Sequence, residues 1–159
     1  MRVTGSYSRI VFALLVVACF VAFFLTQRLK HTPTVVQAFK LTPRFAPATS
    51  GEGKLEKISF RLAHSDRVTV AIVDSSGSDV ATLLRDLPVV RYKQLSLRWT
   101  GREGSARGYA LVPGPNGRHA LEPRIRGRLA PAGEYRVRVS LRKQHRTVLS
   151  PRTFALVAR

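Results

Sequence analysis

The sequence predicts an all-β fold, an antiparallel β-sandwich preceded by one N-terminal transmembrane helix. After residue 54, apolar and polar residues alternate over about six or seven short segments, as in strands that are buried on one face. Clusters of Gly, Pro, Asp and Ser separate these segments, and no stretch after residue 30 has the 3.6-residue period of a helix. An uncharged apolar run precedes them at residues 10–25.

Length and composition narrow the class of protein. The chain has 159 residues, of which 45% are hydrophobic, and this length suits one domain of ordinary size. The hydrophobic fraction is too high for a wholly disordered polycation. Cys19 is the one cysteine, which excludes an intramolecular disulfide, a CxxC redox pair and a thiolate zinc site.

The apolar run at residues 10–25 is the candidate membrane segment. A helix rises ~1.5 Å per residue and the hydrocarbon core is ~30 Å thick, so the run lies at the short end of spanning length. Arg9 and Arg28 can extend from its two ends toward the headgroups. No A-x-A pattern follows it, which favours an uncleaved anchor over a cleaved signal peptide. We expect a short flank at 1–9, a transmembrane signal anchor at 10–26 and a linker at 27–37.

Two further features concern the fate and the orientation of this segment. The sequence around Cys19 is similar to a lipoprotein processing box, but an apolar stretch follows it where lipoproteins turn polar, so we expect a cysteine buried in a membrane helix.

Positive charges on the two sides of the apolar run are nearly balanced. The small N-terminal flank favours an N-terminus inside and a C-terminal domain outside the cytoplasm, at the cell membrane.

Strands are expected where apolar and polar residues alternate with a period of two residues. The turn cluster at 74–79 predicts a hairpin between the second and third alternating segments. Pro151 is expected to split the last segment or to confine it to a sheet edge. The alternating segments are 56–63, 67–74, 80–86, 94–99, 134–142 and 146–157, after a first edge strand within 35–41.

Short motifs between residues 38 and 157 occur in the order of a known domain. They lie at 45–47, 51–53, 58–62, 68–74, 97–101 and 131–137. Together they resemble the immunoglobulin-like domain of the flagellar hook-capping (FlgD-type) family. The resemblance implies an immunoglobulin-like sandwich in an extracytoplasmic module, with Trp99 in the core and with Gly101 and Gly133 at turns. It transfers no binding partner.

The chain departs from the family pattern at two places. The usual F-S-P-N opening is replaced by Phe45-Ala46-Pro47-Ala48, and the connection between the W-x-G and G-x-Y motifs is long, at residues 102–132. We expect an inserted hairpin there, with Pro115-Asn116-Gly117 at its tip.

No pattern of catalytic or ligand-binding residues is present in the sequence. His64 and Asp66 are close in sequence but are more typical of a solvated loop pair than of a metal site, and Asp74 and Asp79 read as turn carboxylates. Neither a G-x-S-x-G elbow nor a phosphate-binding loop occurs. We therefore expect no enzyme activity, no catalytic residues, no cofactor and no metal.

Charge is the remaining signal. The formal net charge is +18, and residues 91–159 carry 16 Lys and Arg against 3 acids. Arg136, Arg138 and Arg142 are predicted to lie on the outward face of one strand, with Arg98 on a neighbouring strand. These four form a candidate anion-binding strip for anionic lipid headgroups or acidic cell-envelope polymers. The alternative is an ordinary solvated face, because Arg outnumbers Lys 21 to 6 throughout the chain.

The function that these features favour is that of a single-pass membrane protein. It would display an extracytoplasmic immunoglobulin-like domain as a non-enzymatic adhesion, scaffold or envelope-binding module, with no protein partner identified by the sequence. The alternative is a basic nucleic-acid-binding protein. Against it, Trp99 and Tyr135 are needed in the core, which leaves few exposed aromatic residues for stacking on bases.

Overall fold

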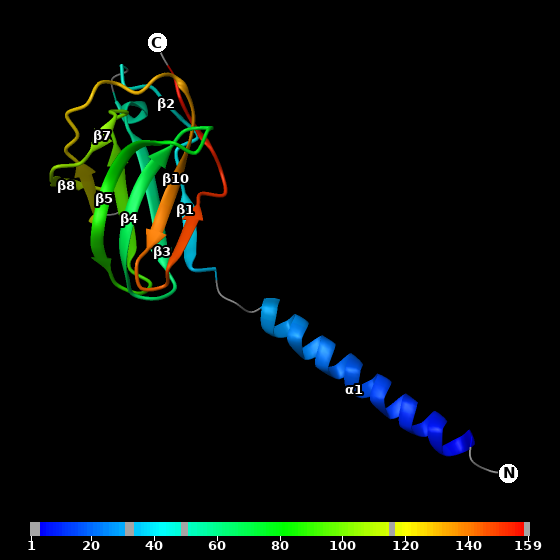
Figure 1. Ribbon diagram of the computed structural model, residues 1–159. Helices are drawn as coiled ribbons and strands as arrows, with labels where there is room; N and C mark the ends of the chain where they lie inside the picture. Colours follow the sequence, from blue (N-terminus) through cyan, green and yellow to red (C-terminus); the bar gives the residue numbers. More distant parts are fainter. Residues whose placement is uncertain (1–3, 31–33, 49–50, 115–116, 158–159) are drawn as a thin grey trace. The chain divides into compact units, whose positions relative to one another are not determined.

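The chain divides into two compact units, Met1–Thr34 and Val35–Arg159. The computed structural model describes residues 4–30, 34–48, 51–114 and 117–157 (Figure 1). The predicted linker at 27–37 is partly taken up by regular structure, because the helix runs to Lys30 and the first strand begins at Val36. Residues 31–33 of that linker lie outside the described part.

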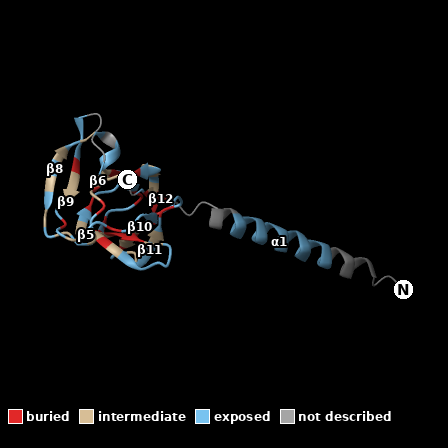
Figure 2. Ribbon diagram, turned by 90° about the horizontal axis from the view of Figure 1, so that it is seen from above, coloured by how far each residue is buried: buried red, intermediate tan, exposed pale blue. Residues whose placement is uncertain are grey.

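The first unit contains one helix, α1, Thr4–Lys30. Residues 10–26 of this helix are exposed, as Figure 2 shows. The side chain of Phe24, for example, is 72% exposed. Among the residues that the structure describes, no helix combines the length and the apolar character needed to cross a membrane. The structure thus shows the predicted helix but does not bear out the transmembrane part of the prediction.

The second unit consists of short strands in two sheets that share one core, which confirms the all-β prediction in its coarse form. Within the described residues, one sheet has the order β1-β3-β6-β9-β8 and the other the order β2-β12-β10-β4-β5-β7, with β11 also paired to β10. The elements are β1 Val36–Lys40, β2 Arg44–Phe45, the 3-10 turn η1 Glu52–Lys54, β3 Glu56–Leu62, β4 Asp66–Val73, β5 Asp79–Val89, β6 Gln94–Trp99, β7 Gly104–Ser105, β8 Tyr109–Pro113, β9 His119–Pro123, β10 Gly133–Leu141, β11 Arg146–Leu149 and β12 Phe154–Leu156.

The sheets are mixed, so the prediction of a purely antiparallel sandwich is wrong for three pairs. β2 with β12, β5 with β7, and β6 with β9 run parallel, whereas the other pairs are antiparallel. In each parallel pair a long stretch of chain separates the two strands, so no tight hairpin fixes their relative direction. Alternation of side chains does not distinguish the two directions, which is why the sequence pattern missed them.

The central hairpin forms as the turn cluster predicts. β4 and β5 pair antiparallel, and Asp74 organises the turn between them by accepting hydrogen bonds from the backbone N–H of Ser76 (2.9 Å) and of Ser78 (3.0 Å). Such local bonds from a carboxylate to the next backbone N–H groups are what make Asp a turn residue. Strand β5 continues three residues beyond the predicted segment, to Val89.

The C-terminal segment is divided at Pro151, as predicted. The strands β11 and β12 both pair with β10, β11 with its second half and β12 with its first three residues. The long connection at 102–132 contains the antiparallel hairpin β8–β9. Of its predicted tip, Pro115 and Asn116 lie outside the described residues, and Gly117 has a positive φ of 69°.

Trp99 lies in the core between the sheets. It belongs to β6 of one sheet, is fully buried, and has its ring centroid 5.5 Å from that of Phe45, 5.7 Å from that of Tyr135 and 6.0 Å from that of Phe154 in the other sheet. Its Nε1 donates a hydrogen bond to the carbonyl of Arg102 at 2.9 Å, which satisfies its polar atom. The aromatic of the W-x-G motif therefore fills the inter-sheet space, as expected.

The glycine of the same motif is needed for its backbone conformation. Gly101 has φ +78°, and a Cβ there would lie 2.8 Å from Cγ of Pro47. Only a glycine tolerates both the left-handed conformation and this close approach at low cost. Gly133, by contrast, is the first residue of β10 and has no positive φ, and the chain bends at Ala132, just before the strand begins.

Glu56 is a carboxyl group buried in the core. It begins β3 opposite Trp99, accepts a hydrogen bond from the backbone N–H of Thr42 at 2.8 Å through Oε1, and has no partner for Oε2 among the described residues. Desolvation by burial raises the pKa of Glu56 from 4.5 to about 8, against the lowering effect of the Thr42 N–H. The folded protein therefore keeps Glu56 protonated over most of the neutral range.

This burial predicts a pH-dependent stability that Glu56→Gln should remove. Between pH 4.5 and about 8 the folded state binds a proton that the unfolded state releases, so the free energy of unfolding should fall as the pH rises through this range. Each unit of pKa difference corresponds to ~1.4 kcal/mol, so the total decrease should be a few kcal/mol. Denaturation of the full chain in neutral detergent, followed by Trp99 emission at pH 5 and pH 8, measures it.

Glu134→Gln is the matched control, because Glu134 is an exposed carboxyl on β10. We expect the Glu134 variant to keep the pH dependence of the wild type. An unchanged pH dependence in Glu56→Gln would show that Glu56 is not the titrating group.

Candidate anion-binding surface

The predicted strip is divided between the two sheets. Arg136, Arg138 and Arg142 follow the outward positions of β10 and its end, while the intervening Val137 and Val139 are fully buried. Arg98 lies on β6 of the opposite sheet, where its Nη2 donates a hydrogen bond to the carbonyl of Pro113. The prediction that Arg98 sits on a strand next to the other three is thus wrong. Alternation indicates which face a residue occupies but not which sheet its strand joins.

An aspartate neutralises Arg138. The Nη2 of Arg138 forms an ion pair with the carboxylate of Asp79 at the start of β5. Strand β4 runs between β10 and β5, and its outward residue opposite Arg138 is the small Ala71. The arginine side chain reaches across β4 to the carboxylate on the second strand.

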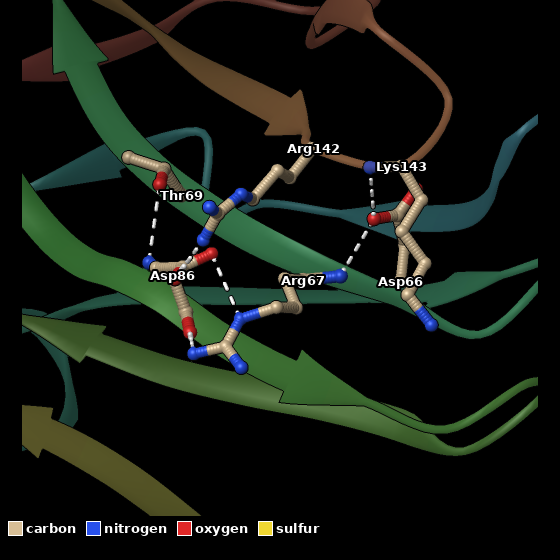
Figure 3. A network of polar contacts seen from close by, with 6 residues as sticks. All are labelled: Asp66, Arg67, Thr69, Asp86, Arg142 and Lys143. Atoms are coloured by element: carbon tan, nitrogen blue, oxygen red, sulfur yellow. Dashed lines mark hydrogen bonds and ion pairs between the residues drawn. The ribbon is translucent and has the colours of Figure 1, made fainter.

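A second aspartate, Asp86, binds two arginines (Figure 3). Its Oδ2 lies 2.7 Å from Nη1 of Arg142, and its Oδ1 lies 3.0 Å from Nε of Arg67. The hydroxyl of Thr69 accepts a hydrogen bond from the N–H of Asp86 at 3.1 Å, which helps to hold this residue at a positive φ of 51°. The Arg67 hydrogen bond, with the charges of Arg142 and Arg67, keeps the pKa of Asp86 below its ordinary value despite partial burial.

Asp66, also drawn in Figure 3, has a structural role. Its carboxylate is buried and accepts hydrogen bonds from the backbone N–H groups of Arg67 (2.6 Å), Lys143 (2.8 Å) and Gln144 (3.2 Å). Burial raises the pKa of Asp66, but these bonds outweigh burial and leave the pKa below its ordinary value. Asp66 therefore ties the start of β4 to the β10–β11 turn, while His64 is exposed to solvent.

The strip therefore retains little free positive charge. Arg138 and Arg142 are paired with aspartates, and within the described part of the chain Arg136 is exposed and has no ion pair. The outer face of this sheet alternates positive and negative groups. An anion bound at Arg138 or Arg142 must displace a carboxylate that is already there.

The sequence reasoning missed Asp79 and Asp86 as members of this surface. Asp86 ends the segment at 80–86 that is predicted to pair with the second alternating strand, and Asp79 is assigned to the predicted turn before it, whereas β5 in fact begins at Asp79. A search for opposite charges on neighbouring strands would have signalled them, since such pairs recur on sheet faces. Which arginine each aspartate meets depends on the order of strands in the sheet.

Possible metal ligands are not clustered in the part of the chain that the structure describes. In the ranges that the structure describes, no three His, Cys, Asp or Glu side chains gather so that they could hold a metal ion. Asp74 is engaged in its own turn and Asp79 in the Arg138 pair, so their carboxylates serve separate structures.

Comparison with known proteins adds no assignment: no family model matches the chain, and no curated protein matches it as a relative. The resemblance to the FlgD-type domain therefore stays a prediction from the motifs in residues 38–157.

We predict that Asp86→Asn strengthens the attraction of the chain for polyanions. The change leaves Arg67 and Arg142 without their shared partner, and because both ion pairs are partly exposed it should lower the free energy of unfolding by less than ~1 kcal/mol. Binding of fluorescently labelled inorganic polyphosphate to the full chain in neutral detergent, at low and at physiological salt, measures the effect.

Glu134→Gln removes one negative charge from an exposed site that forms no ion pair among the described residues. Asp86→Asn should increase polyphosphate affinity more than this control. Equal increases would indicate that only net charge matters and that freeing the two arginines has no local effect.

Proposed function

We propose that the chain is a membrane-attached protein that displays its β-sandwich outside the cytoplasm as a non-enzymatic adhesion, scaffold or envelope-binding module. The observation that carries this proposal is the exposure of apolar side chains along α1. A helix that is apolar on all sides is stable when an apolar environment surrounds it.

The composition of α1 favours lipid as that environment. Residues 10–25 contain no charged or strongly polar side chain, and Arg9 and Arg28 flank them. The run is about 24 Å long at ~1.5 Å per residue, somewhat less than the ~30 Å hydrocarbon core. Local thinning of the bilayer and extension of the flanking arginines toward the headgroups compensate for such a difference.

The short connection between the two units suits display at a surface. Residues 31–34 separate the end of α1 from Val35, which already belongs to the sandwich core. A helix held in lipid would keep the sandwich near the membrane. The basic domain, with 23 Lys and Arg against 9 acids from residue 33 onward, would then lie close to anionic headgroups or acidic envelope polymers.

The immunoglobulin-like, FlgD-type identity of the sandwich is part of the proposal. The hydroxyl of Tyr135 donates a hydrogen bond to the carbonyl of Pro131, four residues upstream. Bonds of this kind, from a strand tyrosine back to the preceding corner, recur in immunoglobulin-like sandwiches beside a buried tryptophan. Trp99 supplies that tryptophan, with its ring edge-on to Tyr135.

The geometry favours attraction of anions by charge spread over the domain rather than by the strip. Aspartates already neutralise Arg138 and Arg142, while Arg98 lies on the other sheet. The nucleic-acid alternative gains no support, because Trp99 and Tyr135 are buried and cannot stack on bases.

Charges placed in the middle of α1 should release the protein from membranes. Two lysines at the centre of a membrane segment cost ~5 to 7 kcal/mol on an insertion scale, so Val16→Lys with Val17→Lys should move the chain from the carbonate-resistant membrane fraction to the supernatant. The control, Thr26→Lys with Gln27→Lys, adds the same charge at the end of the run and should stay with the membrane. If both variants or neither left the membrane, insertion of this run would be ruled out as the attachment.

Labelling of a single cysteine can show on which side of the membrane the sandwich lies. In Cys19→Ser with Ser75→Cys, the thiol lies in the exposed β4–β5 turn. We expect a membrane-impermeant maleimide to label this variant in intact expressing cells, while the wild-type Cys19 is shielded by lipid. Labelling that requires permeabilised cells would place the domain in the cytoplasm and contradict display.

A further inference from the structure

A groove of about 770 Å³ opens on the sandwich, and its described lining residues include none of the predicted strip. The end of β5, the turn into β6 and the β8–β9 hairpin enclose it, so both sheets and the long 102–132 connection contribute to its walls. This volume is within the range of sites that bind small molecules or short chain segments.

The groove has an apolar surface that is open to water. Leu87, Leu95 and Leu121 line it, together with Val90, which is 60% exposed, and Leu111, which is 71% exposed. Large aliphatic side chains exposed together around a hollow are typical of binding sites. The groove therefore favours an occupant with a bulky apolar part.

The rim of the groove is basic. Arg61, Lys93 and Arg118 line the groove, and none of its described lining residues is an Asp or a Glu. Nη1 of Arg118 donates to Oε1 of Gln94 at 2.7 Å, and Arg61 is the partner of Gln94 in the β3–β6 register, so both arginines belong to segments next to Gln94. Among the described residues none of the three cations forms an ion pair, in contrast to Arg138 and Arg142. Charge complementarity therefore favours an anionic occupant.

The backbone at the end of β5 forms part of the wall of the groove. Residues Leu87 to Val90 line the groove consecutively, which indicates that a strand edge, and not one face, bounds it. On the side away from β4, the described strands pair with β5 only at Ala81 and Thr82, through β7. Along the rest of that edge the described residues form no strand pair, and an unpaired strand edge can pair with an extended peptide. Pro88 carries no N–H, so side-chain contacts must supply much of the affinity.

We propose that this groove binds an extended acidic peptide segment of a partner protein. Its bulky apolar side chain packs on Leu111 and Val90, and its carboxylates pair with Arg61, Lys93 and Arg118. The open strand edge favours a peptide over a lipid, whose headgroup offers no backbone to pair with it. The proposal goes beyond display at a membrane and uses residues of the sandwich alone, so it can fail without affecting the proposed attachment.

The test measures binding of peptides to the full chain in neutral detergent. The probe is an array of short fluorescent peptides in which Glu alternates with Leu, Ile, Phe or Tyr, beside the same peptides with Gln for Glu and with Ser for the apolar residue. At least one acidic apolar peptide should bind, and both kinds of replacement should weaken it by about tenfold or more. If no acidic apolar peptide bound, the proposal would be overturned.

Two variants assign the binding to the groove. Arg61→Gln with Arg118→Gln should weaken the peptide about tenfold, and Leu111→Ser should weaken it without unfolding the chain, since Leu111 is largely exposed. The matched control, Arg136→Gln with Arg146→Gln, removes two exposed arginines from the other sheet and should change affinity less than about twofold. Unchanged Trp99 emission verifies folding in each case.

Two other outcomes of the binding test would overturn the proposal. Equal losses in the groove and control variants would show attraction by net charge. Tighter binding of water-soluble dihexanoyl phosphatidylglycerol than of any peptide, with the same dependence on Arg61 and Arg118, would identify a lipid headgroup as the occupant.

Discussion

The packing of Trp99 against Phe45, Tyr135 and Phe154 is the contact on which the sandwich depends. It joins β6 of one sheet to β2, β10 and β12 of the other through a fully buried aromatic cluster. Removal of such a side chain typically costs ~3 to 5 kcal/mol, a large part of the stability of a domain of this size. Because Trp99 and Tyr135 point into this cluster, their neighbours Arg98 and Arg136 lie on the outer faces of β6 and β10.

The surface charge follows from that alternation and from strand order together. Alternation turns the arginines of β10 outward, and the order β10-β4-β5 then brings Asp79 and Asp86 within their reach. The positive charge of Arg138 and Arg142 is consequently compensated by carboxylates on the same sheet. At the groove, by contrast, cations line an apolar hollow whose described lining residues include no carboxylate.

Two apolar surfaces remain exposed among the described residues, and their chemistry differs. The run in α1 is uncharged over its whole length, which suits a hydrocarbon environment. The groove combines aliphatic side chains with arginines and an open strand edge, which suits a chain that carries apolar and acidic groups. In the two proposals made above, the first surface would hold the protein at a membrane and the second would recognise a partner.

The sequence by itself determined the class of the fold, most strands, the inward face of each, the β4–β5 turn, the division at Pro151 and the burial of Trp99. These features depend on local periodicity and turn residues, which act over a few positions. Tertiary structure alone decided the parallel pairs, the placement of Arg98 on the other sheet, and the pairing of Arg138 and Arg142 with aspartates 59 and 56 residues away. It also formed the groove from three distant segments. Such features depend on which strands become neighbours, and that is set by packing of the whole chain around one core, because a period of two fixes the face of a strand but neither its sheet nor its partner.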